Sequence, residues 1–138
     1  MPVEVKLKVR CPQDGLSRVY GNPMELEIAL KMLLQNAVEA VADSGRPVVG
    51  IRSRMRSDGF VEIQIAGRGI GMDEATVKQC FVPFFSTKKA RGGTGLGMAV
   101  AKKIIVARHH GEIDINSKPG KGTIVTVTLP TAEGGEDA

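Results

Sequence analysis

The chain has 138 residues, 42% of them hydrophobic and 25% charged, with a formal net charge of +4 at pH 7. This composition is typical of one globular domain and argues against a disordered chain, and no apolar stretch is long enough to span a membrane. The weak positive charge and the few aromatic residues (four Phe, one Tyr, no Trp) argue against binding to nucleic acid.

The first half of the chain predicts a strand, a long helix and a hairpin. Residues 3–9 alternate between apolar and charged, as a half-buried strand does. The Asn-Pro pair at 22–23 is a typical helix start, and apolar residues then recur at helical spacing from about 24 to 42. Residues 47–54 and 60–65 alternate again, which predicts two strands joined by a short turn.

The second half predicts two more helices and a second hairpin. A short helix is expected over 73–78, and a long one, rich in glycine at its start, over 95–108. Between them lies a glycine-rich and basic segment, 81–93. The last hairpin joins 113–115 to 123–129. This order predicts an α/β two-layer sandwich, with helices on one face of a mixed, largely antiparallel sheet.

One domain is expected over residues 1–130, followed by a flexible acidic tail over 131–138. Cys11 and Cys80 lie far apart and outside any ligand pattern, so no zinc site of standard spacing is available. We interpret them as free thiols of a protein in the reducing cytoplasm.

Three features favour a phosphate ligand. Gly69 and Gly71 form a tight glycine turn after a strand, where backbone N–H groups can approach a ligand closely. The glycine-rich run 92–97 leads directly into a helix, whose N-terminus attracts anions. Asn36 interrupts an apolar helix, where a metal ion or phosphate would satisfy its amide. Each feature alone has a structural explanation: a turn, close helix packing or a satisfied core asparagine.

Four segments, in order and spacing, carry a more specific signal: QNAVEAV, GRGIGMD, FVPFFSTKKARGGTGLGMAVAKKII and GKGTIVTVTLP. They resemble the N, G1, F, G2 and G3 boxes of sensor histidine kinases, especially those of the nitrogen-regulation type. The resemblance covers about residues 21–130. It implies the Bergerat (GHKL) ATP-binding fold, which type II topoisomerases and MutL share.

The resemblance implies ATP and Mg²⁺ as ligands and assigns residues to them. Asn36 would coordinate Mg²⁺ on the triphosphate. Gly69 and Gly71 would shape the floor of the adenine pocket, Met72 would form an apolar wall, and Thr123 would lie beside the base.

Around the phosphates, the resemblance implies a lid segment and the start of a helix. The phenylalanines of the F box would anchor the lid, which runs over 86–93. Lys88 would neutralise phosphate charge, as lysines of kinases and ATPases do. The residues assigned to the phosphates are Lys88, Gly93, Thr94, Gly95, Leu96 and Gly97.

Two positions depart from the family pattern. Gly67 stands where the G1 box begins with an aspartate that accepts the adenine amino group, and loss of that contact would weaken binding by about 10- to 150-fold. Met32 replaces a polar residue one turn before Asn36. A degenerate, kinase-like binding module that signals through protein contacts is therefore an alternative interpretation. An ATPase of the topoisomerase type is disfavoured, because Met32 supplies no carboxylate.

The function implied by the resemblance is that of an ATP-binding kinase domain. It would pass the γ-phosphate of ATP to a histidine on a separate dimerisation domain, and from there to a response regulator. His109 and His110 lack the acidic neighbour typical of such an acceptor, and we interpret them as favourable charges at a helix C-terminus. The resemblance therefore implies that the phosphoacceptor lies outside these residues, and that the domain is part of a cytoplasmic protein or of the cytoplasmic part of a membrane-bound sensor.

Overall fold

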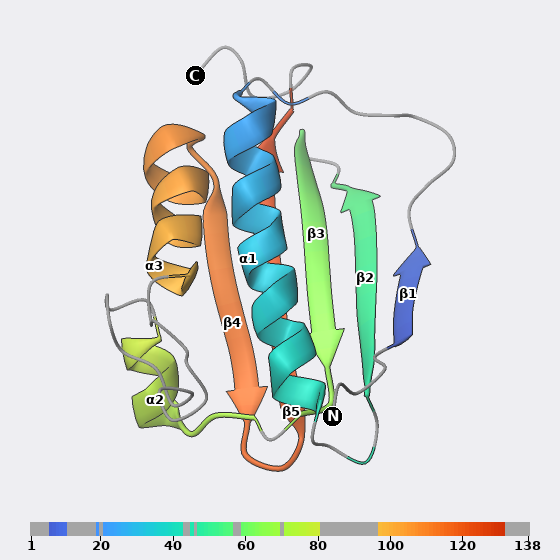
Figure 1. Ribbon diagram of the computed structural model, residues 1–138. Helices are drawn as coiled ribbons and strands as arrows, with labels where there is room; N and C mark the ends of the chain where they lie inside the picture. The colour runs from blue at the N-terminus through green and yellow to red at the C-terminus, as the bar shows by residue number, and fades with distance from the viewer. Residues whose placement is uncertain are drawn as a thin grey trace.

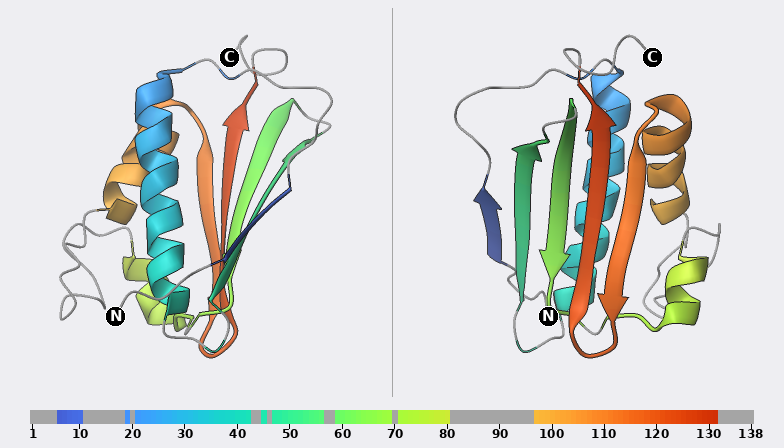
Figure 2. Two further views of the ribbon diagram at one scale, coloured as in Figure 1. Left: turned by 45° about the vertical axis from the view of Figure 1, so that its right-hand side comes forward. Right: turned by 180° about the vertical axis from the view of Figure 1, so that it is seen from behind.

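The computed structural model describes residues 6–10, 19, 21–42, 45, 47–56, 59–69, 71–80 and 97–131. Figure 1 shows a sheet whose one face is covered by helices, and the view from behind in Figure 2 shows the other face without any helix among the described residues. The elements in chain order are β1 (Lys6–Arg10), α1 (Pro23–Ala42), β2 (Val48–Met55), β3 (Phe60–Gly67), α2 (Glu74–Gln79), α3 (Gly97–Lys102), the π-helix η2 (Lys103–Arg108), β4 (Glu112–Lys118) and β5 (Gly122–Pro130).

The described strands form one mixed sheet in the order β1-β2-β3-β5-β4. β1 pairs with β2 in parallel, and every other neighbouring pair is antiparallel. The predicted two-layer sandwich and both predicted hairpins are therefore confirmed. β3 and β5 lie side by side in the centre, although β3 is followed by the glycine loop and α2 in the chain.

The core lies between the sheet and the helices. Alternation along β5 turns Val125, Val127 and Leu129 toward the helices and leaves Ile124 exposed on the open face. Leu33 of α1 is fully buried against this layer, as its helical spacing predicts. Each such aliphatic side chain contributes about 1.5–3 kcal/mol when it is removed from water.

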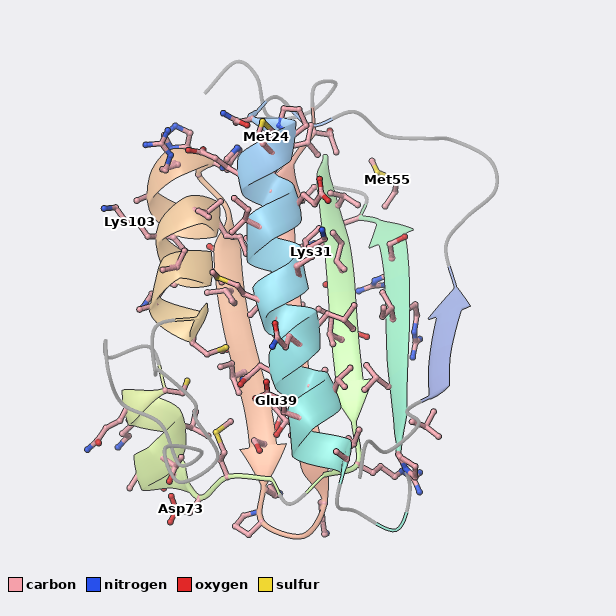
Figure 3. The ribbon with its side chains drawn as sticks, viewed as in Figure 1. Met24, Lys31, Glu39, Met55, Asp73 and Lys103 are labelled. Carbon is pink, nitrogen blue, oxygen red and sulfur yellow. The ribbon has the colours of Figure 1, made fainter. Side chains whose placement is uncertain are left out.

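The starts of two helices are capped by side chains. The Asn22 carboxamide oxygen accepts hydrogen bonds from the backbone N–H groups of Met24 (3.0 Å) and Glu25 (3.2 Å) at the start of α1. At the start of α2, the carboxylate of Asp73, which Figure 3 labels, accepts a hydrogen bond from the Thr76 N–H at 2.8 Å. Hydrogen bonds from the side chain and the backbone of Thr76 hold the pKa of Asp73 below its usual value. Both caps follow the sequence signals at these positions.

The second long helix differs from the prediction of one regular helix over 95–108. Its described part begins at Gly97 as α3 and continues as the π-helix η2 from Lys103. Apolar spacing alone does not predict this change, because it does not distinguish the backbone hydrogen bonding of an α-helix from that of a π-helix. The Gly111 N–H donates to the Ile105 carbonyl oxygen at 2.8 Å.

His109 does not act as a charge at the helix end, contrary to the sequence interpretation. It is only 4% exposed, and its Nδ1 lies 2.8 Å from the Ile104 carbonyl oxygen while the Asn22 N–H points at Nε2 from 3.0 Å. A carbonyl only accepts and an N–H only donates, so Nδ1 carries the proton and the ring is neutral. The ring leaves no space for a Cβ at Gly21. His109 thus joins the end of η2 to the start of α1.

An ion pair strengthens this junction. The Arg108 guanidinium forms a two-point contact with the Glu25 carboxylate, with Nε to Oε1 and Nη2 to Oε2 both at 2.8 Å. Such a fork geometry is the favoured one for an arginine and a carboxylate. The two helices are therefore fastened at the end of the domain that lies away from the glycine loop (Figure 1).

Candidate functional site

The G1 glycine loop lies between the last turns of α1 and the β4–β5 turn. An added Cβ at Gly69 would lie 2.5 Å from the Ala40 carbonyl oxygen. Gly71 adopts a φ of +72°, and its Cβ would overlap the Lys118 carbonyl oxygen. Both glycines are thus required by close backbone approach, and Gly71 also by its left-handed conformation.

Ser117 joins this loop to the β4–β5 hairpin. Its Oγ accepts a hydrogen bond from the Met72 N–H at 2.8 Å and lies 2.7 Å from the Thr123 Oγ1. It also lies within donating distance, 3.0 Å, of the Gly122 carbonyl oxygen. Met72 and Thr123, both predicted to surround the base, are therefore held together through one serine hydroxyl.

Sequence reasoning did not single out Ser117. A signal was nevertheless present, because Ser117 follows Ile113 and Ile115 at alternating positions of β4, and both isoleucines pack against the core. A serine at the next inward position is a polar side chain that needs partners. Finding its partners required the fold, since Met72 is 45 residues away.

Gly67, at the position of the missing aspartate, pairs with Val49 on one side and with Thr123 on the other. An added Cβ at Gly67 would lie 2.8 Å from the Val41 Cγ1. Val41 is fully buried, so its methyl group occupies the space beside Gly67 within the helix-covered layer. A side chain at Gly67 would require Val41 to move.

The start of α3 lies beside α1 (Figure 1). An added Cβ at Gly97 would contact the Met32 Cβ at 3.9 Å, an ordinary van der Waals distance. Asn36, which is half-buried, follows Met32 by one helical turn toward the glycine loop. Asn36, Gly97 and the glycine loop thus belong to the same half of the domain.

Several predicted site residues lie outside the described part of the chain. They are the F-box phenylalanines Phe81, Phe84 and Phe85, and Lys88, Gly93, Thr94, Gly95 and Leu96. Their assignment to the phosphates stays a prediction.

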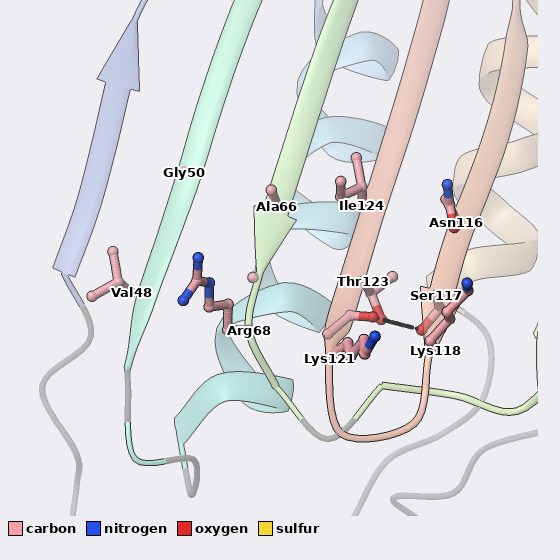
Figure 4. Close-up of a pocket in the computed structure, with 12 residues that line it drawn as sticks. Val48, Gly50, Ala66, Arg68, Asn116, Ser117, Lys118, Lys121, Thr123 and Ile124 are labelled. Atoms are coloured by element: carbon pink, nitrogen blue, oxygen red, sulfur yellow. Dashed lines mark hydrogen bonds between the residues drawn. The ribbon is translucent and has the colours of Figure 1, made fainter.

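A hollow of about 690 Å³ lies on the opposite, open face of the sheet (Figure 4). Its floor includes Gly50 and Ala66, whose small side chains leave room, and its rim includes Arg68, Lys118 and Lys121. The lining also includes Gly67 and Thr123. Thr123 is predicted to lie beside the base, whereas none of the other lining residues belongs to the predicted nucleotide site.

Metal binding at this site would need oxygen atoms from a ligand. Within the residues described by the structure, no group of three or more His, Cys, Asp or Glu side chains is placed to bind a metal ion. Mg²⁺ commonly binds to proteins through one or two side chains and the phosphates of a nucleotide. Asn36, a single amide oxygen donor, fits that mode.

In the same described part of the chain, no helix is long and apolar enough to cross a membrane.

Cys80, which directly follows α2, is expected to be an unreactive thiol. It is free and buried, and burial raises the pKa of the thiol above its usual value. Because the thiolate is the nucleophile, a higher pKa leaves less of it at pH 8. We expect iodoacetamide to modify Cys80 at least about tenfold more slowly in the native protein than in urea, measured by peptide mass spectrometry. Equal rates would contradict the burial.

The family described as "Histidine kinase-, DNA gyrase B-, and HSP90-like ATPase" matches residues 21–133. The chain is also similar to the sensor histidine kinase ZraS of Klebsiella oxytoca, with 41% identity over 118 residues that cover 86% of this chain and 24% of the relative. Sporulation kinase E of Bacillus subtilis is 37% identical over 124 residues, which cover 90% of this chain and 16% of the relative. The chain therefore spans less than a quarter of the length of these relatives.

Solved structures show the same fold. The catalytic domain of histidine kinase ThkA, in a nucleotide-free form, superposes with a TM-score of 0.76 and 28% identity, covering 91% of this chain and 78% of that chain. The mycobacterial sensor histidine kinase MprB gives a TM-score of 0.76 with 25% identity, covering 92% of this chain and 82% of that chain. The relatives found by sequence and those found by structure are thus both histidine kinases or kinases.

Proposed function

We propose that this chain, which belongs to the histidine kinase-, DNA gyrase B- and HSP90-like ATPase family, serves a sensor histidine kinase as its ATP-binding catalytic domain. The observation that carries the proposal is the family match over 21–133, combined with a fold that gathers Asn36, Gly97 and the glycine loop in one half of the domain. The kinase relatives favour this function over a degenerate binding module.

The proposed nucleotide lies between α1 and the start of α3. Gly69, Gly71, Met72 and Thr123 surround the base, and Asn36 holds Mg²⁺ against the triphosphate. The phosphates are bound by the residues predicted for them from sequence: Lys88, Gly93, Thr94, Gly95, Leu96 and Gly97. When bound, Mg²⁺ would neutralise part of the negative charge on the phosphate oxygens.

Phosphoryl transfer requires mainly positioning and charge neutralisation from the protein. The proposed acceptor is a histidine on a separate dimerisation domain, from which the phosphoryl group passes to an aspartate of a response regulator. His109 is unsuited to this role because it is buried and both of its ring nitrogens are hydrogen-bonded. The domain, proposed to comprise residues 1–130, would act in the cytoplasm, where ATP is available. Of the tail predicted over 131–138, only Thr131 lies within the described residues, and it is buried, with its N–H (3.0 Å) and its hydroxyl (2.7 Å) both donating to the Gly59 carbonyl oxygen.

Calorimetric titration with a non-hydrolysable ATP analogue tests the proposal. We expect the chain to bind one analogue molecule in the presence of Mg²⁺ and to bind it more weakly when EDTA removes the metal. Absence of binding under both conditions would reject the proposed function and favour the degenerate module, for which Gly67 is the specific argument.

A further inference from the structure

The polar side chains nearest to Gly67 on the neighbouring strands are hydroxyl groups. Gly67 is paired in register with Thr123 of β5, and Thr123 is paired with Ser117 of β4. Figure 4 shows the two hydroxyl groups facing each other. The nearby Asp73 carboxylate is exposed and accepts the Thr76 N–H as a helix cap. Asp73 therefore does not take the place of the aspartate that Gly67 lacks.

The two hydroxyl groups can arrange their protons in two ways. Ser117 accepts the Met72 N–H in both arrangements and has one proton to donate. If that proton goes to the Gly122 carbonyl oxygen at 3.0 Å, Thr123 donates to Ser117 and presents lone pairs to a ligand. If Ser117 instead donates to Thr123 at 2.7 Å, the Thr123 proton is free to point at a ligand. Thr123 can thus present an acceptor or a donor.

A purine base offers opposite polarity at its six-position in the two common nucleotides. Adenine carries an amino group, which donates, and guanine carries a carbonyl oxygen, which accepts. A carboxylate only accepts and would reject guanine, whereas a hydroxyl that can present either polarity accommodates both. Val41 keeps the Gly67 side apolar, since its methyl group fills the space where a polar side chain would begin.

We infer that the base subsite of this domain accepts purine nucleoside triphosphates as a class and discriminates little between adenine and guanine, because Ser117 and Thr123 replace a carboxylate as its polar groups. This inference rests on the proposed function and specifies the substrate class of the same site. It makes Thr123 a specificity-determining residue. Ser117 is the positioning residue, because its hydrogen bond sets the direction of the Thr123 hydroxyl proton.

The first test compares non-hydrolysable analogues of ATP and GTP by calorimetry, with Mg²⁺ and the unmodified chain. We expect dissociation constants within about tenfold of each other, which is less than the effect of one hydrogen bond to a charged group. If the ATP analogue binds and the GTP analogue binds more than about tenfold more weakly, the inference is overturned while the proposed function stands. If neither analogue binds, the proposed function itself fails.

Two variants locate the cause. The double substitution Val41→Ala and Gly67→Asp, compared with Val41→Ala alone, should increase the preference for the ATP analogue by about 10- to 150-fold. Thr123→Val removes the hydroxyl group and leaves the shape of the side chain nearly unchanged. It should lower the affinity for both analogues to a similar extent. Thr126→Val, on the open face of the same strand, is the matched control and should change neither affinity. A Thr123→Val variant that binds both analogues like the unmodified chain would overturn the role of the hydroxyl pair.

Discussion

Replacement of Gly71 by alanine is expected to destabilise the domain by about 2–5 kcal/mol. Two effects add at this position. An L-residue in the left-handed region costs about 1–2 kcal/mol, and Gly71 has a φ of +72°. The new methyl group would also overlap the Lys118 carbonyl oxygen, and forcing atoms into a packed region costs about 1–3 kcal/mol more. Equilibrium unfolding in urea, followed by circular dichroism, measures the loss.

Gly120 provides a matched control for this prediction. Its φ of +76° is nearly the same, but no atom lies within 4 Å of an added Cβ. Gly120→Ala should therefore lower the free energy of unfolding only by the conformational cost of the left-handed residue, about 1–2 kcal/mol. Equal losses of unfolding free energy in the two variants would show that the glycine loop does not press against the β4–β5 turn, which would contradict the geometry described for the site.

Replacement of Asn36 by alanine is expected to weaken nucleotide binding in the presence of Mg²⁺ and to reduce the dependence of binding on Mg²⁺. In the proposed site the Asn36 amide oxygen is the metal ligand that the described part of the chain contributes, so its loss leaves the ion held by phosphates and water alone. Removal of one interaction with a charged group corresponds to an affinity loss of about 10- to 150-fold. Calorimetry with a non-hydrolysable ATP analogue, with and without Mg²⁺, measures both effects.

Gln35→Ala is the control for Asn36. Gln35 precedes Asn36 on α1, is exposed, and makes a 3.2 Å hydrogen bond from its side-chain nitrogen to Glu39. This variant should keep both the affinity and its dependence on Mg²⁺, since an exposed hydrogen bond on a helix surface contributes little. An Asn36→Ala protein that responds to Mg²⁺ as the Gln35→Ala protein does would exclude Asn36 as the metal ligand.

The predicted elements agree with the structure where a local pattern decides them. Alternation predicted both hairpins, and helical spacing with an Asn-Pro start predicted α1, which begins at Pro23, within one residue of the expected start. Asp73 marked the start of α2 for the same local reason, since a side-chain oxygen can satisfy the first N–H groups of a helix. These features depend on residues only a few positions apart.

Sequence by itself thus determined the fold class, the order of the elements and the family, because periodicity, caps and motif spacing are properties of short segments. Only the tertiary structure decided that η2 is a π-helix, that His109 is neutral and joined to Asn22, and that Ser117 connects Met72 to Thr123. For His109 and Ser117 the physical reason is the same: the partners lie 87 and 45 residues away in the chain, and only the packing of sheet and helices brings them within hydrogen-bond distance. For η2 the reason is that apolar spacing does not distinguish the backbone hydrogen bonding of a π-helix from that of an α-helix.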